Sequence, residues 1–74
     1  MPHDSDVYAK KLRKKYPIET IEKHIEKIEQ LGYIVTLTDY QCQIFDGSTL
    51  LIDADFFEDM HTNAADAIES FYTK

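Results

Sequence analysis

The apolar residues of this chain change their spacing at Gly32. Before Gly32 they recur at intervals of three and four residues, which is typical of a helix that buries one face. After it, the segment 33–53 alternates apolar with polar positions and is rich in β-branched and aromatic residues, which predicts strands. This change of period within 74 residues predicts an α+β fold, in which Gly32 ends the helix as a C-cap residue in the left-handed conformation. The residues with helical spacing are Ile18, Ile21, Ile25 and Ile28.

A second helix is expected before Pro17. Its apolar positions Tyr8, Leu12 and Tyr16 recur every four residues, and an acidic or hydroxyl residue within 4–6 can cap it. Proline disrupts a helix interior but is favoured at a first helical position. The sequence therefore predicts two N-terminal helices broken at Pro17, or one helix that is kinked there.

The strand region predicts a three-stranded antiparallel meander joined by two tight turns. A two-residue turn at Asp39-Tyr40 pairs Leu37 with Cys42. For the second turn we expect the three-residue loop Phe45-Asp46-Gly47, which pairs Cys42 with Leu50 and keeps apolar residues on one face. The core face of this sheet is then expected to hold Tyr33, Val35, Leu37, Cys42, Ile44, Leu50 and Ile52.

The chain is expected to end in a helix packed on the sheet. Asp55 can cap this helix, and apolar residues follow at spacings of three and four. A break near Thr62-Asn63 is an alternative, because Asn63 with Asp66 resembles a second N-cap. The expected apolar stripe consists of Phe57, Met60, Ala64, Ala67 or Ile68, and Phe71.

Size and cysteine content restrict how such a chain is stabilised. Residues 1–74 are expected to form a single small domain with residues 1–4 as a disordered terminus, and a chain this short buries only about 60% of its unfolded surface. The single cysteine, Cys42, excludes an internal disulfide, so oligomerisation is one remaining means of stabilisation. The polar, acidic start "MPHDSD", the lone thiol and the lack of a long apolar run indicate a cytoplasmic protein.

Charge is distributed unevenly along the chain. Residues 1–30 contain seven basic and six acidic groups, whereas residues 31–74 contain one basic and eight acidic groups, giving +1 and −7 and a total of −6. Net acidity argues against docking of the whole protein on nucleic acid, whose phosphates would repel it. It permits binding to a basic partner.

Five carboxylates form a predicted acidic ridge on the C-terminal helix. Four recur at near-helical spacing opposite the apolar stripe and the fifth flanks them, with no Lys or Arg in residues 53–70. Carboxylates at such intervals lie about 5 to 6 Å apart, comparable with successive phosphates, so the ridge can compete for the basic groove of a nucleic-acid enzyme. The alternative is that these acids serve only solubility. The acidic ridge comprises Asp55, Glu58, Asp59, Asp66 and Glu69.

The first helix carries a basic cluster, and the sheet carries an apolar patch on its second face. The basic helix can contact nucleic acid, a membrane or an acidic protein, or it can pair with the acidic ridge. Because no nucleic-acid module accompanies it, we do not expect nucleic acid or a membrane as the partner. The patch marks a self-association or partner surface, or it is core covered by the first helix. The basic helix comprises Lys10, Lys11, Arg13, Lys14 and Lys15, and the patch comprises Ile34, Phe45 and Leu51.

Residues suited to catalysis or metal binding lack the spacing that such sites need. The three histidines are scattered, and no zinc motif or glycine-rich phosphate loop is present. Cys42 lies on the expected core face, where burial raises its pKa and makes it inert. The acids near "DGSTLLIDAD" do not follow the calcium-loop pattern. We therefore expect no enzyme activity, no metal and no cofactor.

In size, acidity and its helix, meander and helix order, the chain resembles the small proteins with which phages block host nucleases. These include anti-CRISPR and anti-restriction inhibitors, and the resemblance covers the architecture rather than any motif. It implies a non-enzymatic protein that binds the basic surface of a nucleic-acid-processing enzyme. The alternatives are a small oligomeric structural or regulatory subunit assembling through the sheet patch, and a nucleic-acid binder acting through the basic helix.

Overall fold

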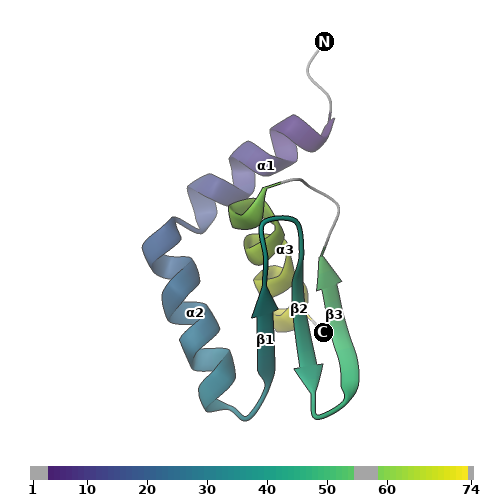
Figure 1. Ribbon diagram of the computed structural model, residues 1–74. Helices are drawn as coiled ribbons and strands as arrows, with labels where there is room; N and C mark the ends of the chain where they lie inside the picture. Colours follow the sequence, from purple (N-terminus) through teal and green to yellow (C-terminus); the bar gives the residue numbers. More distant parts are fainter. Residues whose placement is uncertain (1–3, 55–58, 74) are drawn as a thin grey trace.

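The computed structural model describes residues 4–54 and 59–73, with side chains from residue 7 onward. It confirms the α+β class and the expected order of elements (Figure 1). These elements are α1 (Asp4–Lys15), α2 (Ile18–Gln30), β1 (Ile34–Leu37), β2 (Cys42–Asp46), β3 (Thr49–Ala54) and α3 (Met60–Tyr72).

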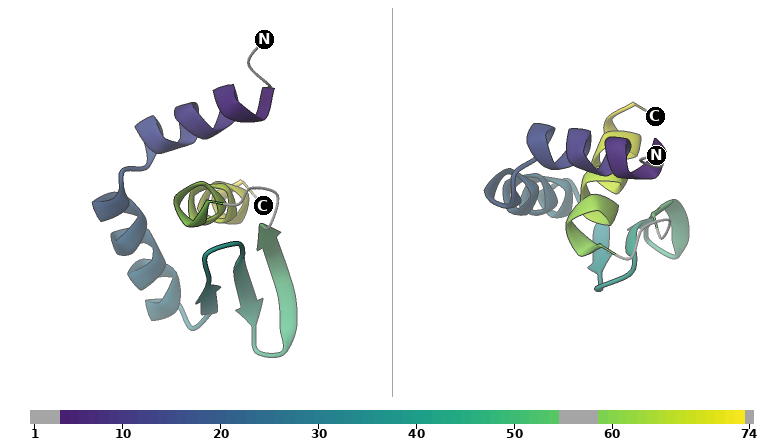
Figure 2. Two further views of the ribbon diagram at one scale, coloured as in Figure 1. Left: turned by 45° about the horizontal axis from the view of Figure 1, so that its top comes forward. Right: turned by 90° about the horizontal axis from the view of Figure 1, so that it is seen from above.

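The centre of the fold is α3. It contacts β2 and β3 on one side and both N-terminal helices on the others. Figure 2 shows it nearly end-on, with the sheet on one side, α1 on the opposite side and α2 closing the space between them. Because other elements pack on several sides of α3, its buried residues are mostly small. They are Thr62, Asn63, Ala64, Ala65, Ala67 and Ile68.

The two N-terminal helices are separate, which decides between the break and the kink. Pro17 has φ −59° and ψ 159°, outside the helical region, and its carbonyl accepts the first α2 bond from the Ile21 amide at 2.9 Å. Pro17 is therefore the N-cap residue rather than the first helical residue. At the other end of α2, Gly32 has φ +99°, as the sequence predicts.

The first sheet turn is as expected. Leu37 pairs with Cys42 in an antiparallel β1–β2 ladder, and the Thr38 amide donates to the Gln41 carbonyl at 2.8 Å across Asp39-Tyr40. Because successive strand residues point to opposite faces, the pairs Leu37–Cys42 and Val35–Ile44 face α3.

The second turn corrects the predicted register. Its loop is the two-residue Gly47-Ser48, with Asp46 opposite Thr49 and Gly47 at φ +63°. Phe45 then pairs with Leu50, so Leu50 lies on the face away from α3 and the prediction that it belongs to the core is wrong. Leu50 is 46% exposed.

A β-bulge explains how the sheet tolerates this two-residue loop. The register shifts between Ile44 and Phe45, with Leu51 as the extra residue of β3. Beyond the shift, Ile44 pairs with Ile52 and Cys42 with Ala54, so the inner face is apolar again. The predicted three-residue loop would have kept the apolar residues on one face through an extra residue in the turn. In the protein the extra residue lies inside β3 instead.

The start of α3 also differs from the prediction. Asp59, with φ −150° and ψ 107°, is the N-cap, and its Oδ1 accepts from the His61 and Thr62 amides at 3.0 and 3.4 Å. Asp55 is therefore not the cap of α3, and both Asp55 and Phe57 lie outside the described residues. The helix continues through Thr62-Asn63, so the alternative of a break there is wrong.

Most of the expected apolar residues do form the core. The buried set consists of Leu12, Ile21, Ile28, Cys42, Ile44, Ala54, Ala64, Ala65, Ala67 and Ile68, with Tyr33, Val35, Ile52 and Phe71 packed against it. Besides Leu50, three residues expected to be buried in the interior stay partly uncovered. Ile18, Leu37 and Met60 are 63%, 37% and 46% exposed.

Candidate functional site

The described part of the acidic ridge faces α1. Asp59 forms an ion pair with Arg13, and the Lys15 ammonium lies 3.7 Å from the Glu69 carboxylate. Asp66 accepts a hydrogen bond from the Tyr8 hydroxyl. The basic helix therefore pairs with the acidic ridge at Asp59 and Glu69, while Asp66 is bound by the Tyr8 hydroxyl of the same helix. Asp55 and Glu58 lie outside the described residues.

Tyr8 shows how closely α1 is fitted to this acidic side of α3. Burial raises the pKa of Tyr8 above its ordinary value of 10.0. The hydrogen bond to Asp66 and the negative charges of Asp66 and Glu69 raise it further. Each cause disfavours a phenolate beside carboxylates. The contact between α1 and α3 therefore depends on a neutral Tyr8.

Asp59 makes two kinds of contact, a helix cap and an ion pair. Its Oδ1 caps the first turn of α3 and its Oδ2 pairs with Arg13. A second polar contact lies nearby, where His61 Nε2 bonds the carbonyl of Tyr16. Since a carbonyl only accepts, Nε2 carries the hydrogen. These contacts fix the end of α1 against the start of α3.

The rest of the basic helix points to solvent. Lys10, Lys11 and Lys14 are exposed, while Arg13 and Lys15 reach back to α3. Lys15 also lies over the Tyr16 ring, 5.3 Å from its centroid. The basic cluster is thus divided between an internal contact and a solvated face.

The sheet patch is not covered by α1, because α1 lies on the side of α3 away from the sheet (Figure 2). Ile34 is 53% exposed and pairs across the strands with half-buried Phe45. The corrected register adds Leu50 on the other side of Phe45. Leu51, at the bulge, is half-buried.

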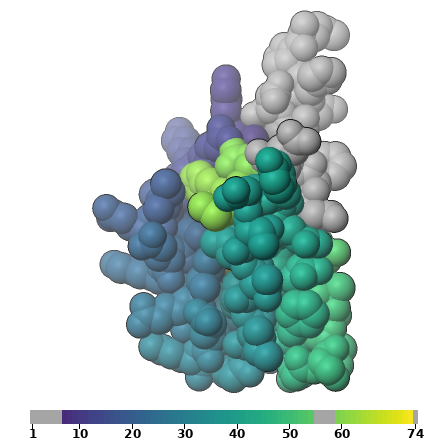
Figure 3. Space-filling view, viewed as in Figure 1, coloured from purple at the N-terminus to yellow at the C-terminus, as the bar shows by residue number. Residues whose placement is uncertain are grey.

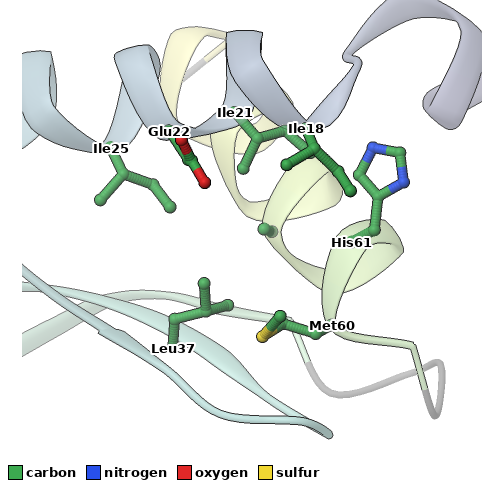
Figure 4. A pocket seen from close by; sticks show the side chains of 8 residues that line it. Ile18, Ile21, Glu22, Ile25, Leu37, Met60 and His61 are labelled. Carbon is green, nitrogen blue, oxygen red and sulfur yellow. The ribbon is translucent and has the colours of Figure 1, made fainter.

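A groove that the sequence reasoning missed opens between α2, the end of β1 and the start of α3. It has a volume of about 110 Å³ and an almost wholly apolar lining. Figure 4 shows the isoleucines of α2 pointing across it toward Leu37 and Met60. In Figure 3 the light-green start of α3 is visible at the surface between α2 and the β1–β2 turn. The lining residues are Ile18, Ile21, Glu22, Ile25, Leu37, Met60, His61 and Ala64.

A row of glutamates runs beside this groove. Its members recur on α2 at intervals of three, four and three, and all of them are exposed. One of them, Glu22, also lines the groove. Helical geometry places Lys23 and Lys27 on the side of this row away from the groove. We call this set the α2 glutamate row: Glu19, Glu22, Glu26 and Glu29.

Both features left a trace in the sequence. The glutamates of α2 recur at the same helical intervals as its isoleucines. The four glutamates must therefore share one face of the helix, next to the face that the isoleucines share. The groove-lining Ile18 and Met60 are the first residues of their helices, and Leu37 is the last residue of β1. Only the arrangement of the elements brings these three ends together.

Cys42 is buried, and His24 and His61 are both hydrogen bonded. Burial raises the pKa of the Cys42 thiol to about 11, as expected for an inert cysteine. His24 Nδ1 and the Tyr72 hydroxyl are hydrogen bonded at 2.9 Å. Within residues 4–54 and 59–73, no group of three or more His, Cys, Asp or Glu is placed to hold a metal ion.

Comparison with protein-family models, curated proteins and solved structures gives no match. In the described part of the chain, no helix has the length and apolar character needed to cross a membrane. The geometry of the chain itself is therefore the basis for a functional proposal.

Variants of Asp59 and Arg13 separate the contribution of the helix cap from that of the ion pair. Asp59→Ala removes cap and ion pair, and we expect it to lower the free energy of unfolding by about 1–2 kcal/mol. Asp59→Asn keeps a good cap and Arg13→Gln keeps the cap intact, so each should cost less than about 1 kcal/mol. Urea denaturation measures all three, and equal losses for Asp59→Asn and Asp59→Ala would show that the cap contributes little.

The raised pKa of Tyr8 predicts that the free energy of unfolding falls at alkaline pH. Because its folded-state pKa is raised, its stabilising effect is complete below the unfolded pKa near 10.0 and declines as the pH rises above it. Between about pH 8 and about pH 10.5, the urea midpoint of the wild type should fall more steeply than that of Tyr8→Phe. Tyr40→Phe, in the exposed β1–β2 turn, is the control and should keep the wild-type steepness.

Proposed function

We propose that this protein is a non-enzymatic binding protein that acts stoichiometrically on a partner protein with a basic surface. The observation that carries the proposal is the α2 glutamate row, which is exposed along its whole length beside an apolar groove. The net charge of −6 acts in the same direction, because it attracts basic partners over the Debye length.

The α2 glutamate row replaces the acidic ridge as the main contact surface in this proposal. Asp59, Asp66 and Glu69 already contact α1, so a partner that bound them would have to rearrange those contacts. That Asp55 and Glu58 contact the partner stays a prediction. The glutamates of α2 need no such rearrangement.

A nucleic-acid-processing enzyme is the proposed class of target. Glutamates at intervals of three and four present negative charges along one line, about 5 to 6 Å apart, as a phosphate backbone does. A surface that normally holds such a backbone is lined with Lys and Arg. In size, acidity and order of elements the sequence resembles phage inhibitors of host nucleases, which is consistent with the same class, and the buried, free Cys42 suits action in the cytoplasm.

Affinity capture from the source cell tests this proposal. The immobilised chain should retain a basic protein at about 50 mM salt and release it at about 500 mM, because salt screens exposed charges. Glu22→Gln combined with Glu26→Gln should abolish retention. Asp39→Asn combined with Asp46→Asn makes the same charge change on exposed loop and strand-end residues and should leave it intact. Retention that is insensitive to salt and to the glutamate variants would refute the proposal.

A second candidate function is that of a small oligomeric subunit. It is favoured by the sheet patch, where half-buried Phe45 lies between Ile34 and Leu50, which are 53% and 46% exposed. Contiguous apolar surface of this kind marks association sites in other proteins. Both outer strands, β1 and β3, are also edges through which sheets can pair.

Sedimentation equilibrium tests the second candidate. If the sheet patch joins copies, the wild type should have the mass of a dimer or larger species, and Ile34→Asp should have the mass of a monomer. Tyr40→Asp, on a side chain that is 62% exposed in the β1–β2 turn, controls for the added charge and should keep the wild-type mass. A monomeric wild type would remove the candidate.

A further inference from the structure

The groove and the α2 glutamate row share one residue, and this makes them a single surface. Glu22 belongs to the row and also lines the groove. Around it, Ile18, Leu37 and Met60 leave apolar surface open to solvent. An occupant of the groove therefore lies within reach of the glutamate charges.

We propose that this groove receives one bulky apolar side chain from a positively charged amphipathic helix of the partner protein. The inference rests on the proposed function, and it specifies which part of the partner is bound. A second copy of this chain and a small apolar molecule are the other possible occupants.

The size of the groove fits a single side chain. Its volume is about 110 Å³. An apolar cavity of about 150 Å³ is large enough to admit benzene, so this groove suits one leucine- or isoleucine-sized group. A helix presents such a group on its own, because its neighbours on the same face lie a full turn away.

Charge decides what flanks that side chain. Of the residues that line the groove, Glu22 carries a negative charge, and Glu19 and Glu26 lie one helical turn to either side of it. A helical segment laid along α2 with Lys or Arg at intervals of three and four would match the row, since both helices have the same period. An uncharged or acidic segment would gain nothing from these glutamates.

The same charge argument disfavours a second copy as the occupant. The exposed lysines that a copy could present are Lys10, Lys11 and Lys14 on α1 and Lys23 and Lys27 on α2. The exposed apolar side chain beside the α1 lysines is Val7, which is smaller than the leucine-sized group that the groove suits. A copy also carries a net charge of −6, so the two chains repel each other as they approach.

Synthetic peptides test the proposal with the full chain. The probe is a helical peptide of Ala and Lys with one central Leu, and it is titrated into ¹⁵N-labelled protein. We expect saturable shifts of the amide signals of Ile18, Leu37 and Met60. Replacing the central Leu by Ser should weaken binding about tenfold or more, because the anchor is lost. Replacing Lys by Glu should abolish binding.

Variants of the protein locate the binding site. Met60→Ser should weaken binding about tenfold. Leu50→Ser is a matched control, because Leu50 is also 46% exposed but lies on the outer face of the sheet, and it should bind as the wild type does. Equal binding by Met60→Ser and the wild type would overturn the proposal, as would equal binding of a peptide whose helix is broken by two central prolines.

The two proposals fail in different ways. If Glu22→Gln with Glu26→Gln weakens peptide binding and Met60→Ser does not, a basic partner binds without using the groove, and the groove proposal is wrong while the proposed function stands. If Met60→Ser weakens binding and the glutamate variants do not, the groove takes an apolar ligand irrespective of charge, and both proposals are wrong about the partner.

Discussion

Every other part of this structure adapts to the burial of α3 on three sides. A helix with a single buried face can carry large residues on that face and charged ones elsewhere. In α3 the sheet covers one side, α2 another and α1 a third, so Ala64, Ala65 and Ala67 occupy positions where larger side chains would hold the neighbouring elements apart. The acidic side chains that remain on α3 must then be accommodated where α1 packs against it, whereas the buried hydroxyl of Thr62 has no hydrogen-bond partner among the described residues.

This requirement explains how the charges are arranged. Asp59, Asp66 and Glu69 lie where α1 packs, and α1 brings Arg13, Lys15 and the Tyr8 hydroxyl to them. The acids of the C-terminal half and the bases of the N-terminal half thus meet within one chain. The α2 glutamates lie on a helix whose outer face meets no other described element, and they remain available for contacts outside the chain.

The sequence predicts the elements well because their patterns are local. The isoleucines of α2, Gly32 and the Asp39-Tyr40 turn each carry a signal within a few residues, and the structure agrees with all of them. The prediction of the β2–β3 register was wrong because a bulge in the strand and a longer loop both keep the apolar residues on one face of the sheet. The alternation of apolar and polar residues alone does not distinguish the two.

The sites were harder to predict than the fold for a related reason. A ridge defined on one helix says nothing about which helix packs against it, so the partners of Asp59 and Glu69 could not be read from their own spacing. Ile18 and Met60 were assigned to the core because each continues an apolar stripe. At the end of an element, however, a side chain loses the cover that the next turn or strand residue would give.

The groove follows from the small number of elements in the described part of the chain. Ile18, Leu37 and Met60 are end residues of three different elements, and closing the space between them would need a further element that the described residues do not provide. Their open surface is apolar area that folding has failed to bury, in a chain whose core is small for its surface. A partner side chain seated there would complete that burial. Because such a ligand binds the folded chain and not the unfolded one, it would also raise the free energy of unfolding, which links recognition at the groove to the stability of the fold.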